Sequence, residues 1–167
     1  MGRYREPQKP GSRYVTPEGY RALQDELSDL WKRRAGVTQA LGEAAAEGDR
    51  SENAEYIYRK KQLREMDRRI RYLQKRLDEL QVVAHQPDAD RIFFGAWVTL
   101  EAHQGGQVTY RIVGPDEFDV SKGYISVDAP VAQGLLNKCL GDEVVVQRPD
   151  GEIRFVVLAI SYTGPPG

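Results

Sequence analysis

The stretch AEYIYRKKQLREMDRRIRYLQKRLDEL at residues 54–80 decides the fold of the first half of the chain. Its apolar residues recur at alternating steps of three and four, the heptad spacing of a coiled-coil seam, which only the polar Arg59 interrupts. The seam residues are Tyr56, Leu63, Met66, Ile70, Leu73, Leu77 and Leu80. The spacing predicts a long helix that needs a partner, because the covered seam supplies its stability.

The same spacing occurs upstream, where Thr16 is a favoured N-cap and Pro17 suits the first position of a helix. The seam residues there are Tyr20, Leu23, Leu27, Leu30, Val37, Leu41 and Ala44, with Arg34 as the one interruption. A short glycine-containing turn at residues 47–51 separates the two stretches. We therefore predict an antiparallel coiled-coil hairpin over residues 15–84. One chain satisfies the seam, so a monomer is expected.

After a linker, the pattern changes to strand-like runs, and Gly105-Gly106 and Asp150-Gly151 are hairpin turn signals. The predicted strands are 92–102, 107–113, 124–127, 143–147 and 152–162. One short helix is predicted from Pro130 to about Cys139. The predicted fold class is α+β: the hairpin is followed by a C-terminal domain, residues 91–163, of antiparallel sheet with one helix. Residues 1–14 are polar and are predicted to form a flexible arm.

Composition excludes several classes of protein. Of the 167 residues, 40% are hydrophobic, and no run approaches the ~18 apolar residues of a membrane-spanning helix. A single cysteine excludes a disulfide scaffold and fits a reducing, cytoplasmic location. The two histidines and the cysteine are far apart in the sequence, which argues against a structural zinc site. Residues 1–82 carry 18 basic and 14 acidic residues, and residues 83–167 carry 6 and 11, so the two halves have opposite net charge.

The predicted hairpin tip is acidic. If the second helix begins at Asp49, then Asp49 and Glu52 lie three residues apart on one face and could share a Mg²⁺ ion. The same residues also fit a capping box, with Asp49 as the N-cap and Glu52 at the third helical position, and Ser51 is an alternative N-cap. An exposed turn cannot exclude water or enclose a metal by itself. Any chemistry at this tip therefore needs another macromolecule to supply the rest of the site.

The second helix is strongly basic. Between residues 59 and 76, nine basic residues face only two acidic ones, and five of the nine fall on one stripe: Lys60, Arg64, Arg68, Arg71 and Lys75. Charges this dense repel one another, so a polyanion would be favoured, and we predict contact with a nucleic-acid backbone without base-specific reading. The alternative is a solvated flank that pairs with Asp25, Glu26 and Asp29 of the first helix.

The sheet module has an acidic surface that fits a basic protein partner. Within it, Asp128 precedes Pro130 and fits an N-cap for the short helix.

Five segments resemble one protein family, the Gre transcript-cleavage factors of bacterial RNA polymerase, and in particular their GreB branch. The segments are GDRSENAEY (48–56), RKKQLREMDRRIRYL (59–73), FFGAWV (93–98), YRIVG (110–114) and YISVDAP (124–130). The resemblance implies a coiled-coil hairpin followed by an FKBP-like domain. It also implies a transcription elongation factor that is not itself an enzyme. Such a factor inserts its hairpin through the secondary channel of the polymerase and stimulates cleavage of backtracked RNA, which releases arrested complexes.

The resemblance also implies roles for individual residues. Asp49 and Glu52 match the catalytic tip acids, which would share Mg²⁺ with the polymerase, no cofactor being bound by the factor alone. Asp128, Ala129 and Pro130 match the loop that docks on the channel rim, although many members have serine in place of Ala129. Ser51, Asn53 and Tyr56 are assigned to tip positioning. Residues assigned to the RNA 3′ segment are Arg59, Lys60, Lys61, Arg64, Arg68, Arg69, Arg71 and Lys75.

Two other functions remain open at this point. One is a module that binds the polymerase channel without stimulating cleavage, against which the complete Asp49/Glu52 pair argues. The other is a peptidyl-prolyl isomerase, which rests on fold analogy alone and would need an apolar, aromatic-lined pocket.

Overall fold

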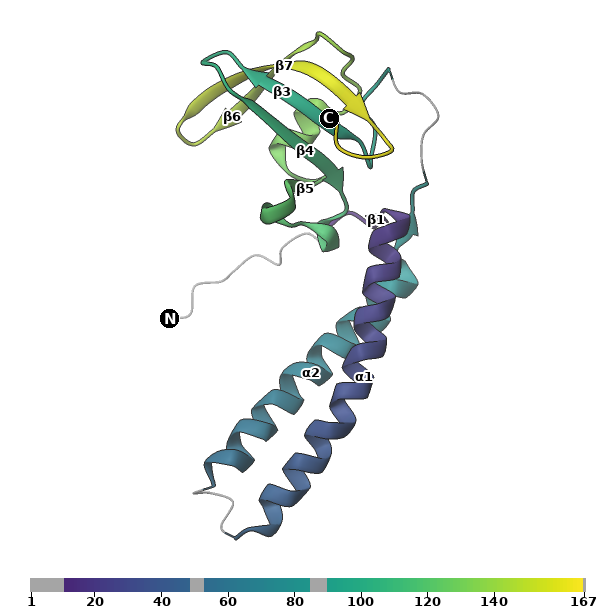
Figure 1. The fold of residues 1–167 in the computed structure, drawn as a ribbon, viewed down its shortest axis with the longest axis vertical. Helices are drawn as coiled ribbons and strands as arrows, with labels where there is room; N and C mark the ends of the chain where they lie inside the picture. The colour runs from purple at the N-terminus through teal and green to yellow at the C-terminus, as the bar shows by residue number, and fades with distance from the viewer. Residues whose placement is uncertain (1–10, 49–52, 85–89, 167) are drawn as a thin grey trace, which may run out of the picture. The chain divides into compact units, whose positions relative to one another are not determined.

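The computed structural model describes residues 11–48, 53–84 and 90–166. They form two compact units (Figure 1): Tyr20–Leu80 is one, and the described residues on either side of that segment are the other. The α+β fold class is confirmed, with two long helices and a five-stranded sheet. Within the described ranges, no helix is both long and apolar enough to cross a membrane.

The hairpin consists of helices α1, Pro17–Ala46, and α2, Ala54–Glu79. The predicted start of α1 is confirmed, because the Thr16 hydroxyl oxygen accepts a hydrogen bond of 3.0 Å from the Gly19 amide. The buried apolar residues belong to the predicted seams: Leu23, Leu30, Val37 and Ala44 in α1, and Met66, Ile70 and Leu73 in α2. Burial along one stripe of each helix is what a two-helix hairpin allows.

Side-chain bonds fix the antiparallel direction of the two helices. As the residue number rises along α1, the number of its partner on α2 falls: Tyr20 donates to the Leu77 carbonyl at 3.3 Å, Glu26 pairs with Arg69 at 2.8 Å, and Arg34 pairs with Asp67 at 2.6 Å. The Arg34 interruption of the α1 seam is thereby explained. Its hydrogen bond to Asp67 lowers the pKa of the Asp67 carboxyl and raises the pKa of Arg34.

The sheet contains β3, Trp97–Ala102; β4, Gln107–Val113; β5, Tyr124–Ser126; β6, Glu143–Arg148; and β7, Gly151–Ser161. Their order is β5-β4-β3-β7-β6. Four strands pair antiparallel as predicted, but β5 pairs parallel to β4, which corrects the prediction of a wholly antiparallel sheet. The connection between them carries two short 3₁₀ helices, Pro115–Glu117 and Val120–Lys122, which bring β5 back in the direction of β4.

One helix, α3, packs on this sheet, and it is shorter than predicted. It spans Pro130–Leu135 instead of reaching Cys139. Asn137 has φ 68°, in the left-handed region, so the chain has left helical geometry there. The core between α3 and the sheet is mainly aliphatic, with Phe155 among its buried members, and Ile92, Val98, Leu100, Ile112 and Leu135 all have no exposed surface.

A two-residue strand β1, Tyr14–Val15, pairs in parallel with β2, Gln81–Val82. The predicted arm therefore ends in a strand at Tyr14, while its first ten residues lie outside the described part of the chain. The close approach of β1 requires a glycine at position 114, because a Cβ there would lie 1.9 Å from the Tyr14 carbonyl oxygen. The Glu117 carboxylate accepts hydrogen bonds from the Thr16 amide, the Thr16 hydroxyl and the Gly114 amide.

Candidate functional site

Asn53 organises the described edge of the hairpin tip. It is the N-cap of α2, and its side-chain oxygen accepts a hydrogen bond of 3.1 Å from the Tyr56 amide. Its side-chain nitrogen donates to the carbonyl of Ala44 on α1 at 2.7 Å. One amide side chain thus starts α2 and ties the two helices together at the tip.

This geometry corrects two expectations about the tip. Neither Asp49 nor Ser51 is the N-cap, because Asn53 holds that position. Since α2 begins only at Ala54, helical spacing does not place Asp49 and Glu52 on one helix face. Local sequence could not choose between the candidates, and the bond from Asn53 to Ala44 is a contact that no spacing rule reveals.

Asp49, Ser51 and Glu52 themselves lie outside the described residues, so their roles stay predictions. The described residues beside them are Gly48, whose φ of 130° favours glycine, and Tyr56, whose ring centroid lies 5.9 Å from the Lys60 ammonium nitrogen. In the part of the chain that the structure describes, no group of three or more histidine, cysteine or acidic residues could hold a metal ion.

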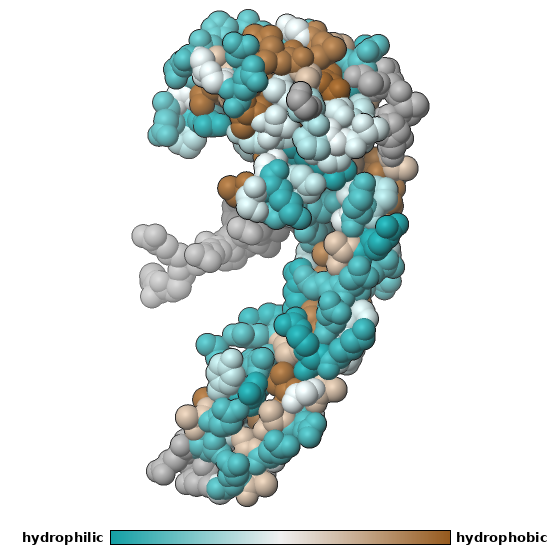
Figure 2. Space-filling view, viewed as in Figure 1, coloured by the Kyte–Doolittle hydropathy of each residue, from teal (hydrophilic) through white to brown (hydrophobic). Residues whose placement is uncertain are grey.

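The basic stripe of α2 faces solvent, since Lys60, Arg64, Arg68, Arg71 and Lys75 are all exposed. Figure 2 shows hydrophilic residues over much of the hairpin surface in view. Among the described residues, Lys61, Arg64, Arg68 and Lys75 have no ion-pair partner. Arg71 contributes a favourable charge to Asp67 and helps to lower the pKa of that carboxyl. The stripe therefore presents positive charge that the described part of the protein does not neutralise.

Two other predicted RNA ligands are already engaged. Arg69 forms a two-pronged ion pair with Glu26, with N–O distances of 2.8 and 2.9 Å. Arg59 donates to Glu55 at 2.8 Å and to Gln62 at 3.0 Å. The alternative prediction, that the basic flank pairs with acidic residues of the first helix, is thus confirmed at Glu26. In the described structure, Asp25 and Asp29 have no ion pair.

Three exposed aromatic residues of the hairpin were not among the predicted site residues. Trp31, Tyr58 and Tyr72 are 44–58% exposed, and each ring lies within 6 Å of an arginine guanidinium. Their position off the heptad seam was the available signal, because a seam residue would be covered and these are not.

The predicted docking loop lies at the start of α3. Ala129 occupies the N-cap position without a side-chain hydrogen bond, and Pro130 is the first helical residue. Asp128 therefore does not cap the helix, which corrects that interpretation. Its exposed carboxylate instead accepts a hydrogen bond of 2.8 Å from the Ser12 amide.

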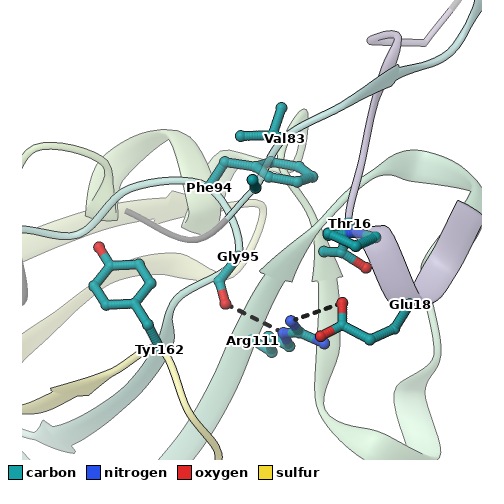
Figure 3. A pocket seen from close by; sticks show the side chains of 9 residues that line it. Thr16, Glu18, Val83, Phe94, Gly95, Arg111 and Tyr162 are labelled. Atoms are coloured by element: carbon teal, nitrogen blue, oxygen red, sulfur yellow. Dashed lines mark hydrogen bonds and ion pairs between the residues drawn. The ribbon is translucent and has the colours of Figure 1, made fainter. Parts of the chain in front are cut away.

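A small cavity of about 80 Å³ lies in the sheet-containing unit (Figure 3). Its buried cation, Arg111, lies 3.8 Å from the Trp97 ring centroid, donates to the Gly95 carbonyl at 3.2 Å and faces Glu18 at 3.6 Å. A hydrogen bond from its own backbone amide, and then the charge of Arg111, lower the pKa of the Glu18 carboxyl. A second groove, of about 210 Å³, is lined by polar residues that include His103, Glu152 and Arg154. The first cavity has Phe94 and Tyr162 in its lining, but it also holds the charged Glu18–Arg111 pair, and its volume is well below the roughly 300–1,000 Å³ of a small-molecule site. The described residues that line the second groove include no aromatic ring other than the His103 imidazole.

Comparison with known proteins finds relatives over nearly the whole chain. Residues 13–82 match the model of the N-terminal domain of transcription elongation factors, and residues 86–162 match the C-terminal GreA/GreB model. Transcription elongation factor GreB of Pseudomonas aeruginosa is 54% identical over 99% of this chain and 100% of that protein. The factor of the same name from Yersinia pestis is 55% identical over 90% of each chain.

The crystal structure of the GreA factor homolog 1 protein of Thermus thermophilus is 25% identical and covers 89% of this chain and 97% of that one. Its TM-score of 0.41 is too low to add to the sequence evidence. The two domain matches and the near full-length relatives carry the assignment. The chain belongs to the GreA/GreB family of transcription elongation factors.

Proposed function

We propose that this chain binds bacterial RNA polymerase, inserts its hairpin through the secondary channel and stimulates the polymerase's own endonucleolytic cleavage of backtracked RNA. The observation that carries the proposal is at the tip. Asn53 supplies both the cap of α2 and the bond to α1, so Asp49 and Glu52 are not required to start that helix. Two acidic residues beside a helix end that is already capped are well suited to act on a partner.

The chemistry of the tip follows from its donor set. Carboxylate oxygens are ligands that Mg²⁺ prefers, and Asp49 and Glu52 would complete the coordination of an ion that the polymerase also holds. The polymerase supplies the remaining ligands and the water-excluding site, which an exposed turn lacks. In this proposal the chain is a cofactor of the polymerase reaction and not an enzyme, and it acts as a monomer.

Other parts of the molecule would bind the RNA and the polymerase surface, so that the tip reaches the active centre. The exposed stripe on α2 would hold phosphates of the extruded RNA 3′ segment, since its uncompensated charge favours a polyanion. Asp128, Ala129 and Pro130 would dock on the rim of the channel, where the acidic C-terminal half fits a basic protein surface.

The experiment is Mg²⁺-dependent RNA cleavage in backtracked complexes of bacterial RNA polymerase. We expect Asp49→Asn to lower stimulated cleavage about 100-fold or more, because one metal ligand is lost, while competition assays show unchanged polymerase binding. Glu47→Gln is the matched control, since Glu47 is an exposed acidic residue beside the tip.

Transcripts that stay uncut with the wild-type protein bound would support the alternative, a channel-binding module without cleavage activity. Equal cleavage by wild type and Asp49→Asn would remove the proposed role of the tip. Loss of polymerase binding together with activity would instead assign the acidic residues a structural role.

A further inference from the structure

Tyr58 is an exposed aromatic residue close to the tip that helix packing does not explain. Its relative exposure is 58%, and that of its neighbour Ile57 is 54%. Both lie off the seam, in the first two turns of α2. Both side chains are therefore available to a partner that approaches the predicted catalytic tip.

The ring of Tyr58 is supported by a side chain that is itself held in place. The guanidinium carbon of Arg59 lies 5.4 Å from the ring centroid. Arg59 is fixed by Glu55, which accepts from its Nε at 2.8 Å, and by Gln62, which accepts from a terminal nitrogen at 3.0 Å. With these donors engaged within α2, Arg59 is better placed to orient the ring than to bind a phosphate.

Positive charge surrounds this ring. Lys61 lies three residues after Tyr58, so the two side chains are neighbours on the helix, and Arg64 follows one turn further along. Both are exposed and have no ion pair among the described residues. An aromatic ring with adjacent cations is the combination that binds single-stranded nucleic acid, since bases stack on the ring while phosphates meet the cations.

We propose that Tyr58 is a stacking platform for an unpaired base of the RNA strand, that Arg59 positions its ring, and that Lys61 and Arg64 contact the adjoining phosphates. The inference deepens the proposed function and rests on it, because it assigns a base-stacking residue to the RNA whose phosphates the stripe would hold. Stacking tolerates any base, since every base has a π-face. Duplex RNA keeps its bases stacked on one another and offers none to the ring.

The first test uses the isolated full-length protein and a short single-stranded RNA that carries a fluorescent adenine analogue near its 3′ end. We expect quenching on binding, which Tyr58→Phe keeps because the ring remains. Tyr58→Leu should lose the quenching and bind about fivefold more weakly. Ile57→Ala is the matched control, equally exposed and without a ring, and should quench like the wild type. Circular dichroism checks that every variant keeps its helix content.

A second measurement separates the positioning residue from the phosphate ligands. Lys61→Gln should lower the slope of log affinity against log salt by about 0.7, because one released counterion is lost. Arg59→Gln should reduce quenching and leave that slope unchanged. A slope that falls equally with Arg59→Gln would overturn the positioning role. Quenching by Tyr58→Leu equal to wild type, or equal affinity for duplex RNA, would overturn the stacking platform.

The same labelled RNA in a halted, backtracked polymerase complex distinguishes this inference from the proposed function. With Asp49→Asn as the background, cleavage is blocked and the Tyr58-dependent quenching should persist. Quenching without any cleavage by the wild-type protein would overturn the cleavage role and support the stacking site. Cleavage with no Tyr58-dependent quenching, in the complex or in the isolated protein, would support the cleavage role and overturn the stacking site.

Discussion

The hairpin and the sheet-containing unit are built on different amounts of core. Among the described residues, Leu73 is the only large side chain of Tyr20–Leu80 with less than 2% exposure, whereas the sheet-containing unit has ten such residues, Thr16 among them. In addition to its narrow seam, the hairpin has polar links between its helices, at Tyr20, Glu26, Arg34 and Asn53. A pair of helices encloses little, so most of its surface remains available for binding.

Charge also divides the chain, at a boundary close to the end of α2. The half that contains the hairpin carries a net charge of +4 from its 18 basic and 14 acidic residues, and the other half carries −5 from 6 and 11. A thin basic hairpin suits a polyanion, and a self-sufficient acidic unit suits a basic protein surface. The sheet-containing unit thus has the larger buried core, and the hairpin has the larger exposed binding surface for its size.

The largest expected effect is the loss of stability when a buried leucine is truncated in each unit. Leu100→Ala empties a fully enclosed position in β3 and should cost about 3–5 kcal/mol, whereas Leu30→Ala at the hairpin seam should cost about 2–3 kcal/mol because the helices can close on the gap. Trp31 lies in α1 and Trp97 in β3, so a Trp31→Phe background makes fluorescence report the sheet alone, while circular dichroism follows the helices. If each substitution lowers both transitions equally, the two units do not unfold separately.

Much of this division could be predicted from the sequence. The heptad seams and the Thr16-Pro17 start place α1 and most of α2, because helix periodicity and caps are local properties. Parallel pairing of β5 with β4 was missed, since it depends on how a connection of two 3₁₀ helices turns.

The tip shows a second limit of prediction. Three residues in a row of five, Asp49, Ser51 and Asn53, are good N-cap types. The choice of Asn53 follows from its bond to Ala44, nine residues earlier on the opposite helix. The exposed ring of Tyr58 was missed for a related reason, because exposure follows from how α1 and α2 pair.

An intermediate effect is expected at the tip of the hairpin. Asn53→Ala removes the cap and the bond to Ala44 and should destabilise the hairpin by about 1–2 kcal/mol. Asn53→Asp keeps the acceptor for the Tyr56 amide but cannot donate to the Ala44 carbonyl, so it should recover only part of the loss. Helix melting by circular dichroism measures both variants. If Asn53→Asp is as stable as the wild type, the cross-helix bond contributes nothing.

The smallest effect concerns the polar break in the seam. The hydrogen bond from Arg34, with the charge of Arg71, lowers the pKa of Asp67 in the folded protein. Its contribution to stability is therefore present above the unfolded pKa of about 4 and is lost as pH falls through the lower folded value. Both side chains are 33% exposed, so solvent screens the pair. Between pH of about 6 and about 3, the wild-type hairpin should lose about 2 °C more in Tm than Asp67→Asn.

The control for that measurement is Asp29→Asn, since Asp29 has no ion pair among the described residues and its substitution should leave the acid slope unchanged. Added salt should shrink the difference between wild type and Asp67→Asn, because a partly exposed pair is screened. If Tm falls equally with pH in wild type and Asp67→Asn, then the Arg34–Asp67 pair adds no stability and Arg34 contributes to the seam only through the packing of its alkyl chain. In that case the hairpin would depend on Asn53, Tyr20 and the Glu26–Arg69 pair for its polar links, and Arg34→Leu would be expected to stabilise it.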